Sequence, residues 1–87
     1  MKLIIAIIKD TDDAEVIRQL VEKEYRVTRM ASTGGFLRRG NATLLIGVEP
    51  ERVQAAIDVI NNACQPPQPG QHKATIFVVN AVHFEQT

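Results

Sequence analysis

The sequence is poor in the residues that most often make disulfide, metal and nucleic-acid sites. It has no tryptophan, one tyrosine and three phenylalanines among 87 residues. A single cysteine, Cys64, excludes a disulfide within the chain and predicts a reducing compartment, the cytoplasm. Ten basic residues balance ten acidic residues, so the strongly basic face that DNA or RNA binding requires is not expected.

Long apolar runs are also absent. The amino-terminal run at residues 3–8 is too short to cross a bilayer, and acidic residues follow it instead of a small-residue cleavage site. We therefore expect no membrane insertion. A chain of this length has room for one core, which predicts a single domain over residues 1–87. Because small domains bury only about 60–70% of their unfolded surface, a homo-oligomer is expected.

Apolar periodicity predicts four strands and two helices in the order β-α-β-β-α-β. This order is the ferredoxin-like plan, an α+β fold with two helices on one face of an antiparallel sheet. The expected strands are residues 1–9, 25–32, 42–48 and 74–80, and the expected helices are residues 12–23 and 50–64. Three prolines in the connection at residues 65–73 predict a surface loop.

Local signals refine these elements. Asp12 and Glu15 have the spacing of a capping box. Gly47 inside the third strand predicts a bulge or a close approach by a ligand or by backbone. The first helix is expected to bury Ile17, Leu20 and Val21, and the second Val53, Ala56, Ile57, Ile60 and Ala63 or Cys64.

The candidate binding segment is residues 31–41, which hold three of the five glycines. Consecutive glycines allow backbone N–H groups to converge on an anion. The segment lacks the Gly-Lys-Ser/Thr end of a Walker loop and the helix that follows a dinucleotide fingerprint. A plain hairpin tip is the alternative. Phe36 favours a ligand, because an exposed aromatic ring suits stacking on a base.

Neighbouring residues fit a nucleotide. The alternation of residues 25–32 places Tyr25 and Val27 on one face of the strand and Arg26 with Thr28 on the other. Arg26 suits a phosphate, and the amide of Asn41 suits an adenine edge.

Catalysis is not expected. The two histidines, His72 and His83, show no pattern that ties them to Ser32 or Cys64 as a nucleophile and its base. Cys64 at the end of an amphipathic helix fits a core residue. The carboxylates at residues 12 and 13 fit a helix start, and no zinc-ligand spacing occurs.

Four stretches together resemble the PII-like cyclic di-AMP receptors of the nitrogen regulatory protein PII superfamily. They are residues 1–8, the Arg26-x-Thr28 strand, residues 33–41 and the strand end at residues 46–49. The resemblance implies a ferredoxin-like subunit in a homotrimer, with one cyclic di-AMP in each cleft between neighbours. It implies no catalytic activity and no further cofactor.

The resemblance also implies ligand contacts. The loop is expected to order on binding and so to change a surface for a downstream protein, which no motif identifies. Glu24 stands where the family often has asparagine, and the connection at residues 65–73 is shorter than usual. A trimeric interaction module that binds ATP, ADP, AMP or no nucleotide is therefore the alternative. The implied ligand residues are Arg26, Thr28, Gly35, Phe36, Leu37, Asn41, Gly47, Phe77 and Gln86.

Overall fold

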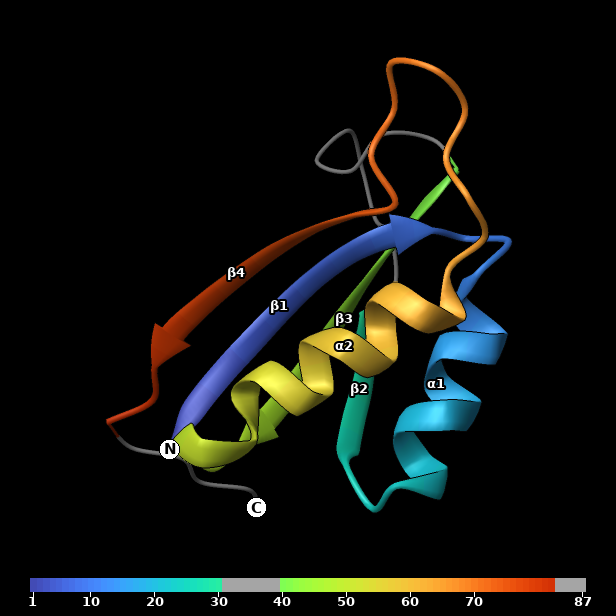
Figure 1. Ribbon diagram of the computed structural model, residues 1–87. Coiled ribbons are helices and arrows are strands. Elements are labelled where there is room, and N and C mark those ends of the chain that lie inside the picture. Colours follow the sequence, from blue (N-terminus) through green and yellow to red (C-terminus); the bar gives the residue numbers. More distant parts are fainter. Residues whose placement is uncertain (31–39, 83–87) are drawn as a thin grey trace.

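A computed structural model describes residues 1–30 and 40–82 (Figure 1). Each predicted element within these ranges is present, and a short 3-10 turn, η2 (Pro50–Arg52), precedes the second helix. The helices are α1 (Asp13–Glu22) and α2 (Val53–Ala63). The strands are β1 (Lys2–Lys9), β2 (Arg26–Met30), β3 (Asn41–Val48) and β4 (Ala74–Asn80).

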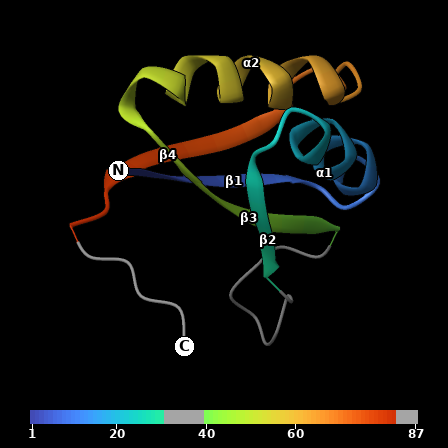
Figure 2. The same ribbon diagram turned by 90° about the horizontal axis from the view of Figure 1, so that it is seen from below.

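The strands form one antiparallel sheet in the order β2-β3-β1-β4. Figure 2 shows both helices on the same side of this sheet. The predicted α+β ferredoxin-like fold is therefore confirmed. Within the described ranges, no helix is long and apolar enough to span a membrane.

The core lies between the sheet and the helices. In β1 every second residue, Ile4, Ala6 and Ile8, is buried on the helix side. Leu20 of α1 and Ile60 of α2 cover this layer and are fully buried. The residues between them in β1 are half-buried on the other face and are also apolar, which explains the unbroken apolar run of the sequence. The inner strand therefore has two apolar faces, of which the helices cover one.

Two predictions for α1 are wrong. Val21 is 56% exposed, whereas Val16 is buried. Val16 and Leu20 lie four residues apart on the face toward the sheet, and Val21 is turned about 100° away from Leu20. Asp12 is the N-cap, as expected, but its side chain makes no cap hydrogen bond. Its Oδ1 instead accepts from the backbone N–H of Gln65 at 3.4 Å, which ties the start of α1 to the end of α2.

The α2 prediction is largely confirmed: Ala56, Ile60, Ala63 and Cys64 are buried. Gly47 makes no bulge, because the register of β3 runs unbroken through it against both neighbours. The glycine that the backbone requires is Gly40, at the start of β3. Its φ of 91° lies in the left-handed region that side chains disfavour.

Candidate functional site

The face of the sheet away from the helices carries the five predicted ligand residues that the structure describes, and we call it the open face (Figure 2). In the register of β2 and β3, Arg26 pairs with Gly47 and Thr28 pairs with Leu45. All four residues lie on the open face. One row across the sheet runs Arg26, Gly47, Leu3, Val79, and the next runs Thr28, Leu45, Ile5, Phe77. These rows bring Arg26, Thr28 and Gly47 together at one end of the β2 edge.

Arg26 is positioned by the turn that ends α1. The backbone N–H of Glu24 donates to the Val21 carbonyl at 2.9 Å, and that of Tyr25 donates to the Leu20 carbonyl at 2.9 Å. This pair of bonds is the Schellman ending of a helix, in which the middle residue adopts a left-handed conformation. Glu24 has a φ of 68°, as the motif requires. Asparagine tolerates this conformation better than glutamate.

Tyr25 anchors the same turn. Its side chain is buried, and the Arg52 guanidinium lies 4.2 Å from the centroid of its ring. Arg52 also donates from Nη2 to the carbonyl of Lys23 at 3.2 Å. A cation over an aromatic ring and a bond to the helix end both hold the chain entering β2. Because Tyr25 faces the core, alternation turns Arg26 to the open face.

The two arginines of β2 have opposite environments. Arg29 faces the helices, and its Nε lies 2.6 Å from Oδ2 of Asp13 at the start of α1. Arg26 is exposed on the open face and makes no ion pair with any residue of ranges 1–30 and 40–82. Arg26 is therefore the β2 arginine whose guanidinium remains for an anionic ligand.

Gly47 keeps the surface beside Arg26 flat. A Cβ added at Gly47 would meet only the sulfur of Met1, at 3.7 Å, which is an ordinary contact. No crowding inside the chain therefore requires glycine there. The missing side chain leaves backbone that a ligand can approach closely.

Phe77 and Asn41 lie apart from this group. Phe77 is on β4, at the opposite edge of the sheet from Thr28, roughly 14 Å away across three strand spacings. Asn41 is at the other end of β3 from Gly47, roughly 20 Å away along the strand. One chain therefore does not bring the predicted residues to a single point. Gly35, Phe36, Leu37 and Gln86 lie outside the described residues.

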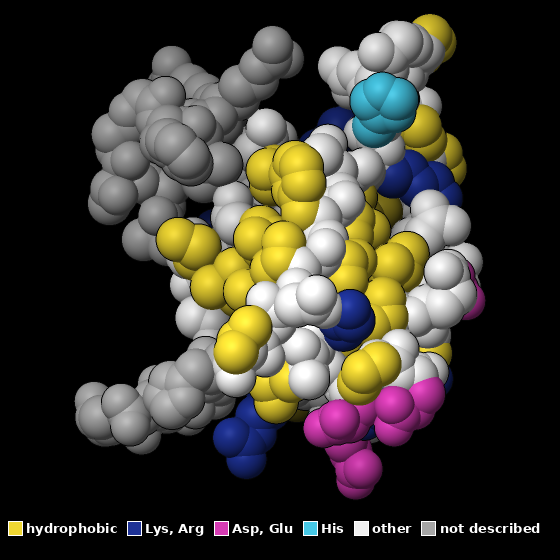
Figure 3. All heavy atoms as spheres, turned by 90° about the vertical axis from the view of Figure 1, so that its left-hand side faces the viewer, with side chains coloured by type: hydrophobic (Ala, Val, Ile, Leu, Met, Phe, Trp, Pro, Cys, Tyr) yellow, Lys and Arg dark blue, Asp and Glu magenta, His cyan; other side chains and the backbone are white. Residues whose placement is uncertain are grey.

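The β4 edge is an exposed apolar surface. Phe77 is 53% exposed, and Val78 and Val79 are exposed to a similar degree. Figure 3 shows hydrophobic side chains gathered over this side of the molecule, with acidic side chains grouped at its lower end. Such a patch on a small domain marks an interaction surface.

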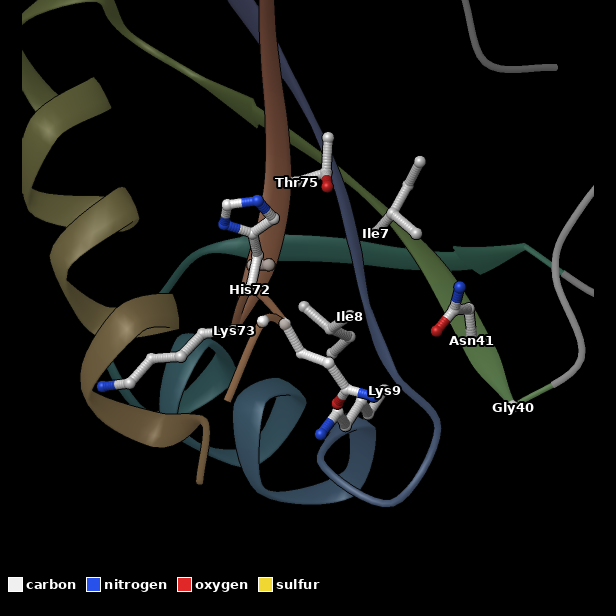
Figure 4. Close-up of a pocket in the computed structure, with 11 residues that line it drawn as sticks. Ile7, Ile8, Lys9, Gly40, Asn41, His72, Lys73 and Thr75 are labelled. Atoms are coloured by element: carbon white, nitrogen blue, oxygen red, sulfur yellow. The ribbon is translucent and has the colours of Figure 1, made fainter. Parts of the chain in front are cut away.

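Asn41 lines a cavity of about 560 Å³ at the other end of the sheet (Figure 4). Lys9, which pairs with Asn41 in register, and His72, from the connection before β4, also line it. No local pattern in the sequence predicts this association. Lys9 ends an apolar strand and His72 lies in a proline-rich loop, so neither carries a local signal, and only the fold brings them together.

Other candidates for chemistry remain structural. Cys64 is buried, and burial raises the pKa of its thiol, which fits the predicted core role. The described part of the chain contains no group of three His, Cys, Asp or Glu side chains that could hold a metal ion.

Comparison with known proteins identifies the family. Residues 1–71 match the family described as "Cyclic-di-AMP receptor". The chain belongs to the cyclic di-AMP receptor family. The matched range includes Arg26, Thr28 and Gly47 and ends before β4, so Phe77 lies beyond it.

One solved structure has a similar fold. It is described as a functionally unknown protein from Pediococcus pentosaceus ATCC 25745, and it is 35% identical to this chain with a TM-score of 0.77. The match covers 99% of this receptor-family chain and 96% of that chain. The two proteins therefore correspond nearly end to end in fold.

Proposed function

We propose that this protein is a signal receptor that binds cyclic di-AMP at the boundaries between identical subunits of a trimer. The observation that carries the proposal is the pairing of exposed Arg26 with Gly47 on the open face, beside Thr28, in a chain of the cyclic di-AMP receptor family. This corner offers a fixed cation, a hydroxyl and bare backbone. The proposal treats residues 1–87 as one cytoplasmic domain without catalytic activity or a further cofactor.

The chemistry of the corner fits a cyclic dinucleotide. The guanidinium of Arg26 offers paired N–H donors to a phosphate, and the hydroxyl of Thr28 adds a hydrogen bond. Gly47 permits the sugar-phosphate ring to lie against β3. Phe77 supplies an aromatic face for an adenine. The remaining ligand residues in the proposal are Gly35, Phe36, Leu37, Asn41 and Gln86.

The separation of these residues supports a site shared between subunits. Thr28 and Phe77 lie on opposite edges of the sheet, so a ligand held between two chains could take one residue from each chain. Each edge also exposes apolar surface, Met30 on β2 and Val79 on β4. Burying such surface contributes a free energy of about 25 cal/mol per Å², which favours association of the open faces. Ligand binding then orders the loop at residues 31–41 and changes the surface offered to a downstream protein.

Calorimetry with cyclic di-AMP, cyclic di-GMP, ATP and AMP tests the proposal. We expect tight binding of cyclic di-AMP alone, with one ligand per chain, and a trimeric mass by light scattering. Arg26→Ala should abolish binding, whereas the control Arg18→Ala, which removes an exposed arginine of α1, should not. Absence of heat with cyclic di-AMP, or tighter binding of ATP, contradicts the proposal.

The second candidate is a trimeric module that binds another nucleotide or none. Glu24 favours it, because a carboxylate two residues from Arg26 is exposed near the phosphate position. The Glu24→Asn variant separates the candidates. Cyclic di-AMP binding that is absent in the natural chain and present in this variant supports the second candidate, and equal binding by both supports the first.

A further inference from the structure

Thr43 is a buried polar residue of β3 on the open face of the sheet. Its residue is only 6% exposed. Within residues 1–30 and 40–82, no group forms a hydrogen bond with its Oγ1. A hydroxyl that is removed from water without a partner carries a cost in free energy, so most buried polar groups in folded proteins are paired. The hydroxyl of Thr43 therefore lacks a partner that the described part of the chain could supply.

The neighbours of Thr43 account for its shape but not for its hydroxyl. Its register partners are Ile7 on β1 and Met30 on β2, and neither carries a strong hydrogen-bonding group. Branching at Cβ suits a strand, and valine has the same branched shape without the polar atom. Packing within one chain would thus be served as well by valine. The hydroxyl points to a use outside the packing of the sheet.

Thr43 lies between two of the proposed cyclic di-AMP contacts. Asn41 is two residues before it on β3, roughly 7 Å away and on the same face. Thr28 pairs with Leu45, two residues after Thr43, so Thr28 and Thr43 are diagonal neighbours roughly 7–8 Å apart. Figure 4 shows Ile7, the β1 partner of Thr43, on the same side of the sheet as Asn41. A ligand that reaches from Thr28 to Asn41 therefore passes over Thr43.

The β2 edge offers a route to this hydroxyl. Met30 is the neighbour of Thr43 on that side, at the end of an edge strand, and it is 46% exposed. Methionine is unbranched and has three rotatable bonds. Its side chain can turn aside without a change in the backbone, which would open Thr43 to a ligand on the open face.

We propose that Thr43 is a further ligand residue of the receptor site, and that its hydroxyl forms a hydrogen bond with the polar edge of an adenine beside Asn41. The inference rests on the proposed function and adds a residue that the family resemblance does not include. The register partners of Thr43 are apolar, and Arg26 pairs with Gly47, four residues and roughly 13 Å further along β3. A neutral hydroxyl between apolar side chains suits a base, which joins an apolar face to a polar edge.

Calorimetry with Thr43→Val tests the residue, because valine keeps the branched shape and removes the hydroxyl. We expect its affinity for cyclic di-AMP to fall roughly tenfold. Thr43→Ser retains the hydroxyl and is the matched control, which should bind nearly as tightly as the natural chain. Cyclic di-IMP keeps the sugar-phosphate ring and changes the polar edge of the base, so Thr43→Val should cost less affinity for this ligand.

Two results of this titration would overturn the proposal. Unchanged cyclic di-AMP affinity in Thr43→Val would remove the residue from the site. Equal losses of affinity for cyclic di-AMP and cyclic di-IMP would place the contact on the sugar-phosphate ring instead of the base. Failure of the natural chain to bind cyclic di-AMP contradicts the receptor function as a whole, whereas full binding by Thr43→Val contradicts the Thr43 assignment alone.

Unfolding of the ligand-free protein in urea is an independent test. Because the hydroxyl of Thr43 has no partner in the described part of the chain, its removal should not weaken the fold. We expect Thr43→Val to unfold at an equal or higher urea concentration than the natural chain. A less stable Thr43→Val variant would show that the hydroxyl is already paired in the free protein, and would overturn the proposal.

Discussion

The backbone N–H of Tyr25 donates to the carbonyl of Leu20 at 2.9 Å and encloses Glu24 in the left-handed conformation, with a φ of 68°. Glycine fits this position without strain and asparagine fits it with little. We expect Glu24→Gly to raise the free energy of unfolding by about 0.5–1 kcal/mol in urea titrations, and Glu24→Asn by less. Glu22→Gly, inside α1, should lower it by about 1 kcal/mol. A Glu24→Gly variant that is less stable than the natural chain would show that the backbone at Glu24 is not strained.

The Asp13–Arg29 ion pair should couple α1 to β2. The Asp13 side chain is 18% exposed, so water screens the pair incompletely. A double-mutant cycle with Asp13→Ala and Arg29→Ala should give a coupling free energy of about 0.5–1 kcal/mol that falls at high salt. The Glu15–Arg18 pair, whose side chains are 46% and 60% exposed, should give a smaller coupling. Equal values for the two pairs would show that burial does not strengthen the first.

Gly40→Ala should destabilise the fold. With a φ of 91°, an added Cβ is strained although open space surrounds it. We expect the free energy of unfolding to fall by about 1–2 kcal/mol in thermal or urea unfolding. Gly70 has a similar φ of 79° in the connection before β4 and serves as a second test of the same effect. Unchanged stability in both alanine variants would refute the conformational requirement.

Gly47→Ala should separate stability from ligand binding. Glycine within a strand costs about 0.5–1 kcal/mol relative to alanine, and an added Cβ meets only the sulfur of Met1. The variant should therefore unfold at equal or higher urea concentration than the natural chain. Its cyclic di-AMP affinity should nevertheless fall, because the methyl group occupies the surface beside Arg26. Unchanged cyclic di-AMP affinity in this variant would show that Gly47 is not part of the ligand site.

Phe77→Ala should weaken cyclic di-AMP binding without unfolding the chain. The ring is 53% exposed on the open face and contributes little to the core of one subunit. Loss of a stacking contact should cost about 1–3 kcal/mol of binding free energy in calorimetry. Val21→Ala, a comparably exposed apolar residue on α1, is the control and should bind normally. Equal affinity of both variants would exclude Phe77 from the site.

The sequence predicted the elements well because their apolar periods are long and regular. Apolar residues recur every three or four positions in residues 53–63, which is the period of a helix. The unbroken apolar run at residues 3–8 is typical of an inner strand with two apolar faces. The predicted capping box does not form, because the Asp12 carboxylate accepts a hydrogen bond from the backbone N–H of Gln65 instead. No local pattern in the sequence indicates this long-range contact. Val21 was misplaced because one residue of rotation decides exposure on a helix.

The site was harder to predict for a topological reason. The family resemblance named residues without saying that Arg26 and Phe77 lie on opposite edges of the sheet. Lys9 and His72 are 63 positions apart in sequence and line one cavity because β1 and β4 are neighbours. Chemistry assembled by strand order cannot be read from a local motif.

The opposite placement of Thr28 and Phe77 has a consequence for sensing. In the proposed trimer a ligand that contacts both residues joins two chains, so binding and subunit association form one linked equilibrium. The apparent affinity then rises with the concentration of the protein itself. A cell that makes more of this receptor would gain sensitivity as well as capacity, and dilute protein would respond weakly to the same level of signal.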